Sequence, residues 1–252
     1  MPSSRSFRPA LLASLLLAPL AALAQPAQTS AAVRQYQAVE RLQAMADAGT
    51  PPALAEVAEQ VRKANNPDVL KDLGTLLPVQ VQMICSNGQH AALISSRFAG
   101  DGSDAAMLQQ LTPAWNDAQV FALQCGAMQL SLQGTALAGL PAAQRPKEEL
   151  DQMRLRTSLL LLGYADVASA VALTEVPQAQ RQALLRDALA AAKQAVRSMP
   201  LHARTQYQQM VRDRVGDVPN ADTALVAPLL AAFSATECDD ACTLLDAEPV
   251  AP

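Results

Sequence analysis

Apolar residues recur every three or four positions through most of this 252-residue chain, which is the spacing that places them on one face of an α-helix. Two such sets are Leu160, Tyr164, Val167 and Val171, and then Leu185, Leu189, Ala192, Val196 and Met199. Prolines separate the helical stretches, and runs that alternate between β-branched and polar residues are missing. The pattern predicts an all-α protein, an array of about nine or ten helices without significant β-sheet.

The stretch Pro78–Gln133 predicts two apolar helices joined by a turn at Gly100–Ser103. We expect the second helix to begin at Thr112 and Pro113, because Thr can cap free N–H groups and Pro at the first helical position gives up no hydrogen bond. This helix carries one charged residue, Asp117, and is otherwise uncharged on every side. A helix of that composition belongs in a protein core.

The positions of two cysteines predict a disulfide between these helices. Cys85 lies 13 residues before Phe98, and Cys125 lies 12 residues after Pro113. With a rise of about 1.5 Å per residue, both cysteines lie at the same height in an antiparallel helical hairpin. The alternative is two buried free thiols, and a helix break at Asn87-Gly88 would spoil the register.

Residues 1–24 have the three parts of a secretory signal peptide. Two arginines supply the positive charge, residues 10–23 form the apolar core, and Ala22-Leu23-Ala24 fits a signal-peptidase site. The apolar run is shorter than the roughly 20 residues that span a membrane. We therefore expect a periplasmic or secreted bacterial protein that starts at Gln25 and has no stable membrane insertion after cleavage.

The mature chain has the length of one helical domain at 25–245, or of two halves at 30–138 and 146–245. Residues 134–146 are the candidate connection, because they are small, nearly uncharged and interrupted by glycine and proline. We expect residues 246–252 to be a disordered tail.

A second pair of cysteines, Cys238 and Cys242, stands near the C-terminus. Four cysteines allow three pairings, so a local bridge and a cross-link to Cys85 or Cys125 both stay open, and we favour the local bridge. It requires a turn or a distorted helix start, which Thr236 as a cap would allow. We favour a structural bridge over a redox pair, because redox motifs usually have two intervening residues and acidic neighbours raise a thiol pKa. A metal site here lacks a second ligand pair at recognisable spacing, so we predict no metal and no cofactor.

Charge divides the C-terminal part of the chain into a basic and an acidic segment. Between Pro177 and Val215 seven bases outnumber two acids, whereas seven acids and no base follow from Gly216 onward. We favour packing of the acidic segment on the basic helices, and the alternative is a face for an anionic partner. That face would consist of Arg181, Arg186, Lys193, Arg197, Arg204, Arg212 and Arg214.

The chain as a whole is acidic, with a formal net charge of −4. Removal of residues 1–24 takes away two bases and no acid, so the mature chain carries about −6. Aromatic residues make up only 3% of the sequence, so an aromatic and basic surface for nucleic acid is missing. We expect no nucleic-acid partner.

No sequence motif identifies a catalytic centre, since the zinc-protease, nucleophile-elbow and phosphate-loop patterns are absent. We therefore predict a protein that acts by binding another protein, as an envelope adaptor, an assembly factor or an immunity-type protein. One alternative is an exported helical hydrolase that uses His90 or His202, because catalytic groups are recognised by geometry and not by sequence order. Another alternative is a carrier of a small apolar ligand, with an internal cavity lined by Leu, Met and Trp115.

The leader prediction can be tested by the intact mass of the exported protein. When the full chain is expressed in a bacterial host, we expect a periplasmic or extracellular product that begins at Gln25 and lacks four thiol hydrogens, because both disulfides form after export. A product that keeps residues 1–24 and stays with the membrane would contradict the prediction.

Overall fold

The computed structural model describes residues 26–50, 52–71, 78–99 and 105–247, and within them it contains nine α-helices and no strand. The predicted all-α fold is confirmed. The predicted leader at 1–24 and the predicted turn at Gly100–Ser103 lie outside the described residues.

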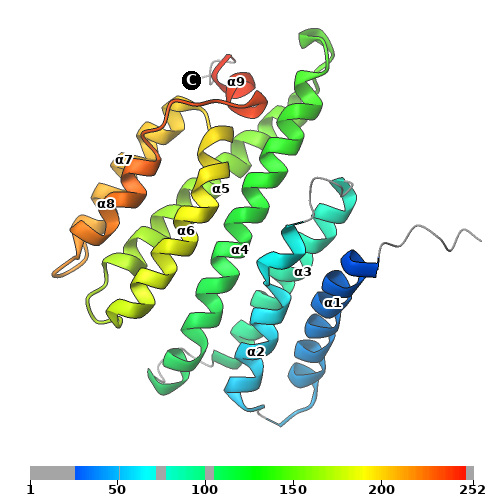
Figure 1. Ribbon diagram of the computed structural model, residues 1–252, viewed down its shortest axis with the longest axis vertical. Helices are drawn as coiled ribbons and strands as arrows, with labels where there is room; N and C mark the ends of the chain where they lie inside the picture. Colours follow the sequence, from blue (N-terminus) through cyan, green and yellow to red (C-terminus); the bar gives the residue numbers. More distant parts are fainter. Residues whose placement is uncertain (1–25, 51, 72–77, 100–104, 248–252) are drawn as a thin grey trace, which may run out of the picture.

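The helices follow one another with short connections (Figure 1). They are α1 (Pro26–Asp47), α2 (Leu54–Ala64), α3 (Pro78–Ser96), α4 (Ala105–Ala138), α5 (Lys147–Ala172), α6 (Gln178–Ser198), α7 (Leu201–Gly216), α8 (Thr223–Ala232) and α9 (Asp240–Ala247). Short 3₁₀ helices are η1 (Pro67–Leu70), η3 (Arg97–Ala99) and η4 (Ala142–Gln144).

Helix α4 is 34 residues long and runs through the middle of the molecule (Figure 1). The predicted start at Thr112 and Pro113 is wrong, because α4 begins at Ala105 and contains Pro113 in its interior. A proline there removes one backbone hydrogen bond. Leu111, two residues before the proline, and Ala114, directly after it, are fully buried, so tertiary packing holds the helix together through the proline.

The predicted disulfide between Cys85 and Cys125 is confirmed, with the two Cα atoms 5.7 Å apart. It fixes the antiparallel register of α3 and α4. Ser95 lies ten residues after Cys85 and Trp115 lies ten residues before Cys125, and the Trp115 indole N–H donates to the Ser95 hydroxyl at 3.0 Å. The first turns of α4 therefore project past the end of α3, which explains why the register argument succeeds although the helix starts earlier than expected.

Gly88 does not break α3 and instead allows its close contact with α4. A Cβ atom at this position would lie 2.5 Å from a ring carbon of Phe121 and 2.7 Å from the side-chain oxygen of Asn65. No larger residue fits without displacing the aromatic ring. The glycine that looked like a helix breaker is a packing residue.

Helix α4 contributes to each of three groups of buried side chains. The N-terminal group joins α1, α2 and α3 to the start of α4 through Leu111, Ala114 and Ala118. The middle group surrounds Cys85 and Cys125. The C-terminal group packs the second half of α4 against α5 to α9. No group would be complete without α4, because each includes buried residues of this helix.

The N-terminal helices are also joined by a buried amide. Gln35 of α1 is fully buried, and its side-chain N–H groups donate to the backbone oxygens of Ala64 at 2.8 Å and Ile84 at 3.0 Å. These acceptors lie at the end of α2 and in the middle of α3. One side chain therefore links three helices through hydrogen bonds that are shielded from water.

The predicted connection at 134–146 needs a correction, because residues 134–138 belong to α4. Gly134 is the point where α9 lies against α4, and a Cβ atom there would come within 2.5 Å of the Ala241 Cα. The predicted tail at 246–252 is wrong at its start, since α9 continues to Ala247 and the Asp246 carboxylate accepts from the Leu201 N–H. Residues 248–252 lie outside the described part.

One described helix, α5, is long and apolar enough to cross a membrane by length and composition. Half of its most apolar window is buried inside the fold, as in the core helix of a soluble protein. Its outer face exposes Leu155 at 61% and Leu159 at 59%.

The contact between α4 and α9 can be tested with Gly134→Ala. An exposed helical glycine gains stability when changed to alanine. Here we expect a loss of about 1–3 kcal/mol in the free energy of unfolding, because the new methyl group meets the backbone of Ala241. Urea unfolding measures the change. Gly216→Ala is the matched control, since nothing lies within 4 Å of its Cβ position, and it should be neutral or stabilising. A neutral Gly134→Ala would contradict this packing.

Candidate functional site

A groove runs along one face of α4, between α2 and η1 on one side and α6 on the other. Two adjoining pockets form it, with volumes of about 420 and 260 Å³, and both are lined by Pro67, Gln124 and Ala190. The floor is a stripe of α4 at helical spacing, with the members Asp117, Val120, Phe121, Gln124 and Met128. Pockets of this size are typical of ligand sites.

The walls of this α4 groove come from distant parts of the sequence. The first wall contains Arg62, Asn65, Asn66, Pro67, Leu70 and Lys71, and the second contains Asp187, Ala190, Ala191 and Gln194. Asn66 shapes the first wall, because its side-chain oxygen accepts from the Asp68 N–H at 2.8 Å and starts η1. Pro67 then takes the first helical position, where its missing N–H costs nothing.

Acidic groups gather at one end of the groove. The Asp117 carboxylate lies 3.3 Å from the Arg62 guanidinium, and both side chains are about half exposed. Burial raises the pKa of Asp117, the neighbouring Arg62 acts against this shift, and the negative charge of Asp187 adds to it. This end therefore offers carboxylate acceptors to a cationic or hydrogen-bond-donating group.

Gln124 lies in the middle of the groove floor, where both pockets meet. Its side-chain oxygen is buried and has no hydrogen-bond partner among the described residues. A buried acceptor that stays unpaired costs about 1–3 kcal/mol. A ligand that donates an N–H here would recover that cost.

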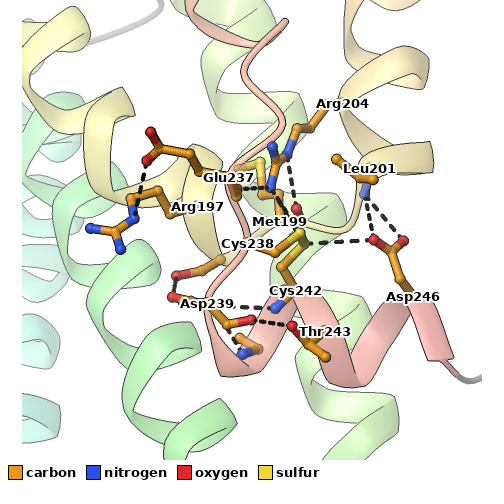
Figure 2. Close-up of a disulfide and its surroundings, with 12 residues drawn as sticks. Arg197, Met199, Leu201, Arg204, Glu237, Cys238, Asp239, Cys242, Thr243 and Asp246 are labelled. Atoms are coloured by element: carbon orange, nitrogen blue, oxygen red, sulfur yellow. Dashed lines mark hydrogen bonds and ion pairs between the residues drawn. A yellow bond between two sulfur atoms is a disulfide. The ribbon is translucent and has the colours of Figure 1, made fainter.

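A second candidate site surrounds the C-terminal cysteines (Figure 2). The predicted local bridge is confirmed, with the Cα atoms of Cys238 and Cys242 5.2 Å apart. The helix cap is Asp239 and not Thr236, because the Asp239 carboxylate accepts from the N–H groups of Ala241 and Cys242 at 2.9 and 3.2 Å. Cys238 therefore precedes α9 and is exposed, whereas Cys242 lies in its first turn and is fully buried.

Arg204 of α7 lies beside the chain segment that precedes α9 and points at this disulfide (Figure 2). The residue is 2% exposed, and its guanidinium donates to the backbone oxygens of Met199, Ala235 and Glu237. One of its nitrogens also lies 3.6 and 3.4 Å from the sulfurs of Cys238 and Cys242. Burial lowers the pKa of Arg204, and nearby carboxylates act against this shift. Arginine nevertheless stays charged.

Asp246 of α9 lies next to the same disulfide (Figure 2). Its carboxylate accepts from the Leu201 N–H at 3.1 Å and lies 3.2 Å from the His202 ring. It also lies 3.6 Å from the Cys242 sulfur, a distance at which a thiol can donate. The sulfurs of Cys238 and Cys242 and a carboxylate oxygen of Asp246 all lie within 4.8 Å of one another, the only such cluster of potential metal ligands in the described part of the chain.

The seven predicted basic residues do not share one face. Arg181 and Arg204 are buried and donate their hydrogen bonds to acceptors inside the protein, so a partner cannot reach them. Arg181 and three others form ion pairs with carboxylates, and the pairs are Arg181–Asp222, Arg186–Asp187, Arg197–Glu237 and Arg214–Asp166. Lys193 and Arg212 are exposed without an ion pair in the described residues. Two of these pairs, to Asp222 and Glu237, join the basic helices to the acidic segment.

The two histidines and Trp115 lie in three separate surroundings. His90 is exposed on α3, and the His202 ring contacts only the Asp246 side chain among the described residues. Neither ring contacts a hydroxyl group there. The pocket beside Trp115 has a volume of about 430 Å³ and is lined by alanine, glutamine and serine, without Leu or Met.

Sequence reasoning missed both the α4 groove and the role of Arg204. The stripe on α4 has the helical spacing that could have marked a shared face, but nothing local shows which residues cover it.

Comparison of the chain with protein-family models, curated proteins and solved structures gives no match. Function is therefore inferred from the geometry of this chain.

The ion pair of Arg181 predicts a pH dependence of stability. Arg181 holds the pKa of Asp222 below its ordinary value of 3.8, helped by the hydrogen bond from the Leu225 N–H. A lowered carboxyl pKa stabilises the fold above pH 3.8, and this contribution is lost as the pH falls through the folded-state value.

We therefore expect Asp222→Asn to be less stable than wild type at pH 7, because asparagine keeps the α8 cap but loses the charge. The gap should close as the pH falls below 3.8. Urea unfolding at several pH values measures it, with the exposed Asp213→Asn as control. A gap that stays constant with pH would contradict the ion pair.

Proposed function

We propose that this is an exported protein that acts by binding, and that the α4 groove receives an extended peptide segment of a partner protein. Export is supported by the leader-like sequence at 1–24 and by two disulfides, which persist in oxidising compartments. The observation that carries the proposal is the continuous stripe on α4 with an unpaired buried acceptor, Gln124, at its centre.

The dimensions of the groove suit a short peptide. From Asp117 to Met128 the floor covers eleven residue steps of α4, or about 16 Å. An extended chain advances about 3.3 Å per residue, so about five residues fit along it. Residues of α6 and η1 border the same α4 stripe on both sides, which leaves no place for another helix to pack along it.

The chemistry along the groove also suits a peptide. Phe121 and Met128 on the floor and Leu70 on the η1 wall line the groove with apolar atoms, although these side chains are mostly buried, at 1%, 5% and 9% exposure. A peptide N–H can donate to Gln124 in the middle, as in other grooves that recognise extended chains. A basic side chain fits the end that holds Asp117 and Asp187.

Peptide selection on the purified mature protein tests the proposal. We expect selected peptides to lose at least about tenfold in affinity for Ala190→Trp, because Ala190 is an exposed residue where both pockets meet and a ring there fills the groove. Gln124→Met should weaken binding about three- to tenfold, because it keeps the shape and removes one acceptor. Isothermal titration calorimetry measures both.

Ala136→Trp is the matched control, since Ala136 is exposed on α4 beyond the groove. It should bind the selected peptides as wild type does. Peptides that bind Ala190→Trp as tightly as wild type would place the binding surface elsewhere. A small molecule that binds the groove while no peptide does would favour a carrier.

A further inference from the structure

The two disulfides of this protein differ in their exposure to solvent. Cys85 and Cys125 are 2% and 1% exposed, inside the packing of α3 and α4. Cys238 is exposed ahead of α9, and its partner Cys242 is fully buried. An external thiolate can therefore reach a sulfur of the second bridge and not of the first. Access of a thiolate to a disulfide sulfur is one of the factors that set the rate of thiol–disulfide exchange.

The surroundings of the second bridge favour its reduced form. The buried guanidinium of Arg204 has three backbone acceptors but forms no ion pair with a carboxylate in the described residues. Its remaining contacts are the two sulfurs, at 3.6 and 3.4 Å. A neutral disulfide is a weak acceptor, whereas a thiolate gives a charge-assisted hydrogen bond. Reduction would thus supply the counter-charge that this buried cation lacks.

The acidic neighbours of the cysteines are turned toward other partners. Asp239 accepts from the N–H groups of α9 and from the hydroxyl groups of Ser131 and Ser198. Glu237 lies 3.8 Å from Arg197. Asp246 is the carboxylate that lies against the buried sulfur, at 3.6 Å, and its charge opposes a thiolate there. Figure 2 shows that Arg204 and Asp246 approach the bridge from different directions.

We propose that the Cys238–Cys242 disulfide is a redox-active site that oxidises dithiols of other proteins. A substrate thiolate attacks the exposed Cys238 sulfur, the bond to Cys242 breaks, and Cys242 leaves as a thiolate beside Arg204. The second substrate thiolate then attacks the substrate sulfur of the mixed disulfide and releases Cys238. The substrate loses two electrons and becomes a disulfide, while the protein disulfide gains them. Cys238 takes up one proton, Cys242 stays a thiolate beside Arg204, and the second substrate proton goes to solvent.

A metal ion is a poorer occupant of the reduced site. Cys238, Cys242 and Asp246 provide three donor atoms within 4.8 Å. A cation bound there would stand next to the guanidinium of Arg204, which touches both sulfurs. Repulsion between the two positive charges opposes metal binding, whereas it does not affect a thiolate.

The α4 groove leads toward this site. Ser198 lies four residues after Gln194, which is part of the α6 wall. Ser131 lies three residues after Met128, which is part of the floor. Both serines donate to Asp239, the residue after Cys238. A segment bound in the groove can therefore bring its own cysteines to the disulfide. This choice of substrate rests on the proposed function, whereas the exchange chemistry does not.

Glutathione redox titration tests the exchange chemistry without any peptide. The oxidised mature protein is equilibrated in glutathione buffers, and its free thiols are trapped with an alkylating agent. Mass spectrometry then measures the reduced fraction of each disulfide. We expect Cys238–Cys242 to become half reduced while Cys85–Cys125 of the same molecules stays oxidised. Simultaneous reduction of the two bridges, or resistance of both, would overturn the proposal.

Two charge variants should move the midpoint in opposite directions. Arg204→Gln should raise the concentration ratio GSH²/GSSG at the midpoint by about tenfold. The bridge becomes harder to reduce because the Cys242 thiolate loses its neighbouring cation. Asp246→Asn should lower it several-fold, because the opposing charge disappears. If Arg204→Gln unfolds the protein in part, the Cys85–Cys125 bridge becomes reducible as well. The midpoint of Asp246→Asn then serves as the test of the proposal. Unchanged midpoints in both variants would overturn the proposal and assign the bridge a structural role only.

Single-cysteine variants test the direction of attack. With oxidised glutathione, Cys242→Ser should form the mixed disulfide at the exposed Cys238 at least about tenfold faster than Cys238→Ser forms it at the buried Cys242. Equal rates would contradict the assigned roles. Ala190→Trp should leave the glutathione midpoint unchanged and slow only the oxidation of a groove-binding dithiol peptide, so failure of the groove and failure of the redox site are distinguishable.

Discussion

The structure depends on the burial of one long helix with almost no charge. Helix α4 extends over 34 residues, or about 51 Å, and carries a single ionisable group, Asp117. Water cannot satisfy the apolar surface of such a helix, so other helices must cover it on nearly all sides. The chain before α4 covers one part, the chain after it covers another, and the Cys85–Cys125 bridge fixes the helix to α3.

This arrangement also produces both candidate sites. Where α2 with η1 and α6 approach α4 from two sides, they leave part of its surface uncovered, and that surface is the floor of the groove. Where α9 lies against Gly134, the chain before it is held over Arg204 and presents Cys238 to solvent. A binding surface and a disulfide of unequal accessibility therefore lie next to consecutive parts of α4.

The sequence predicted what depends on local periodicity and spacing. Helical repeats gave the fold class, and residue counting paired Cys85 with Cys125 even though Pro113 is inside α4 and does not start it. Local signals failed where packing overrides them, as at Pro113 and Gly88, or where two caps compete, as with Asp239 and Thr236.

Contacts between distant segments were beyond such reasoning. Arg204 precedes Cys238 by 34 residues, and the groove combines three segments spread over residues 62–194. Their positions follow from how whole helices pack on α4, and no single window of sequence contains that information. The basic residues illustrate the same point, since burial of Arg181 and Arg204 separates them from the exposed Lys193 and Arg212.

The measurement that tests the central role of α4 most directly is hydrogen exchange by mass spectrometry on the mature protein across a urea series. Because α2 and α7 lie in different buried groups, and α4 contributes buried residues to both, we expect their backbone amides to lose protection at the same urea concentration, together with those of α4 itself. Loss of protection in α1 to α3 at clearly lower urea, while α5 to α9 stay protected, would contradict it and would make the two sides independent units.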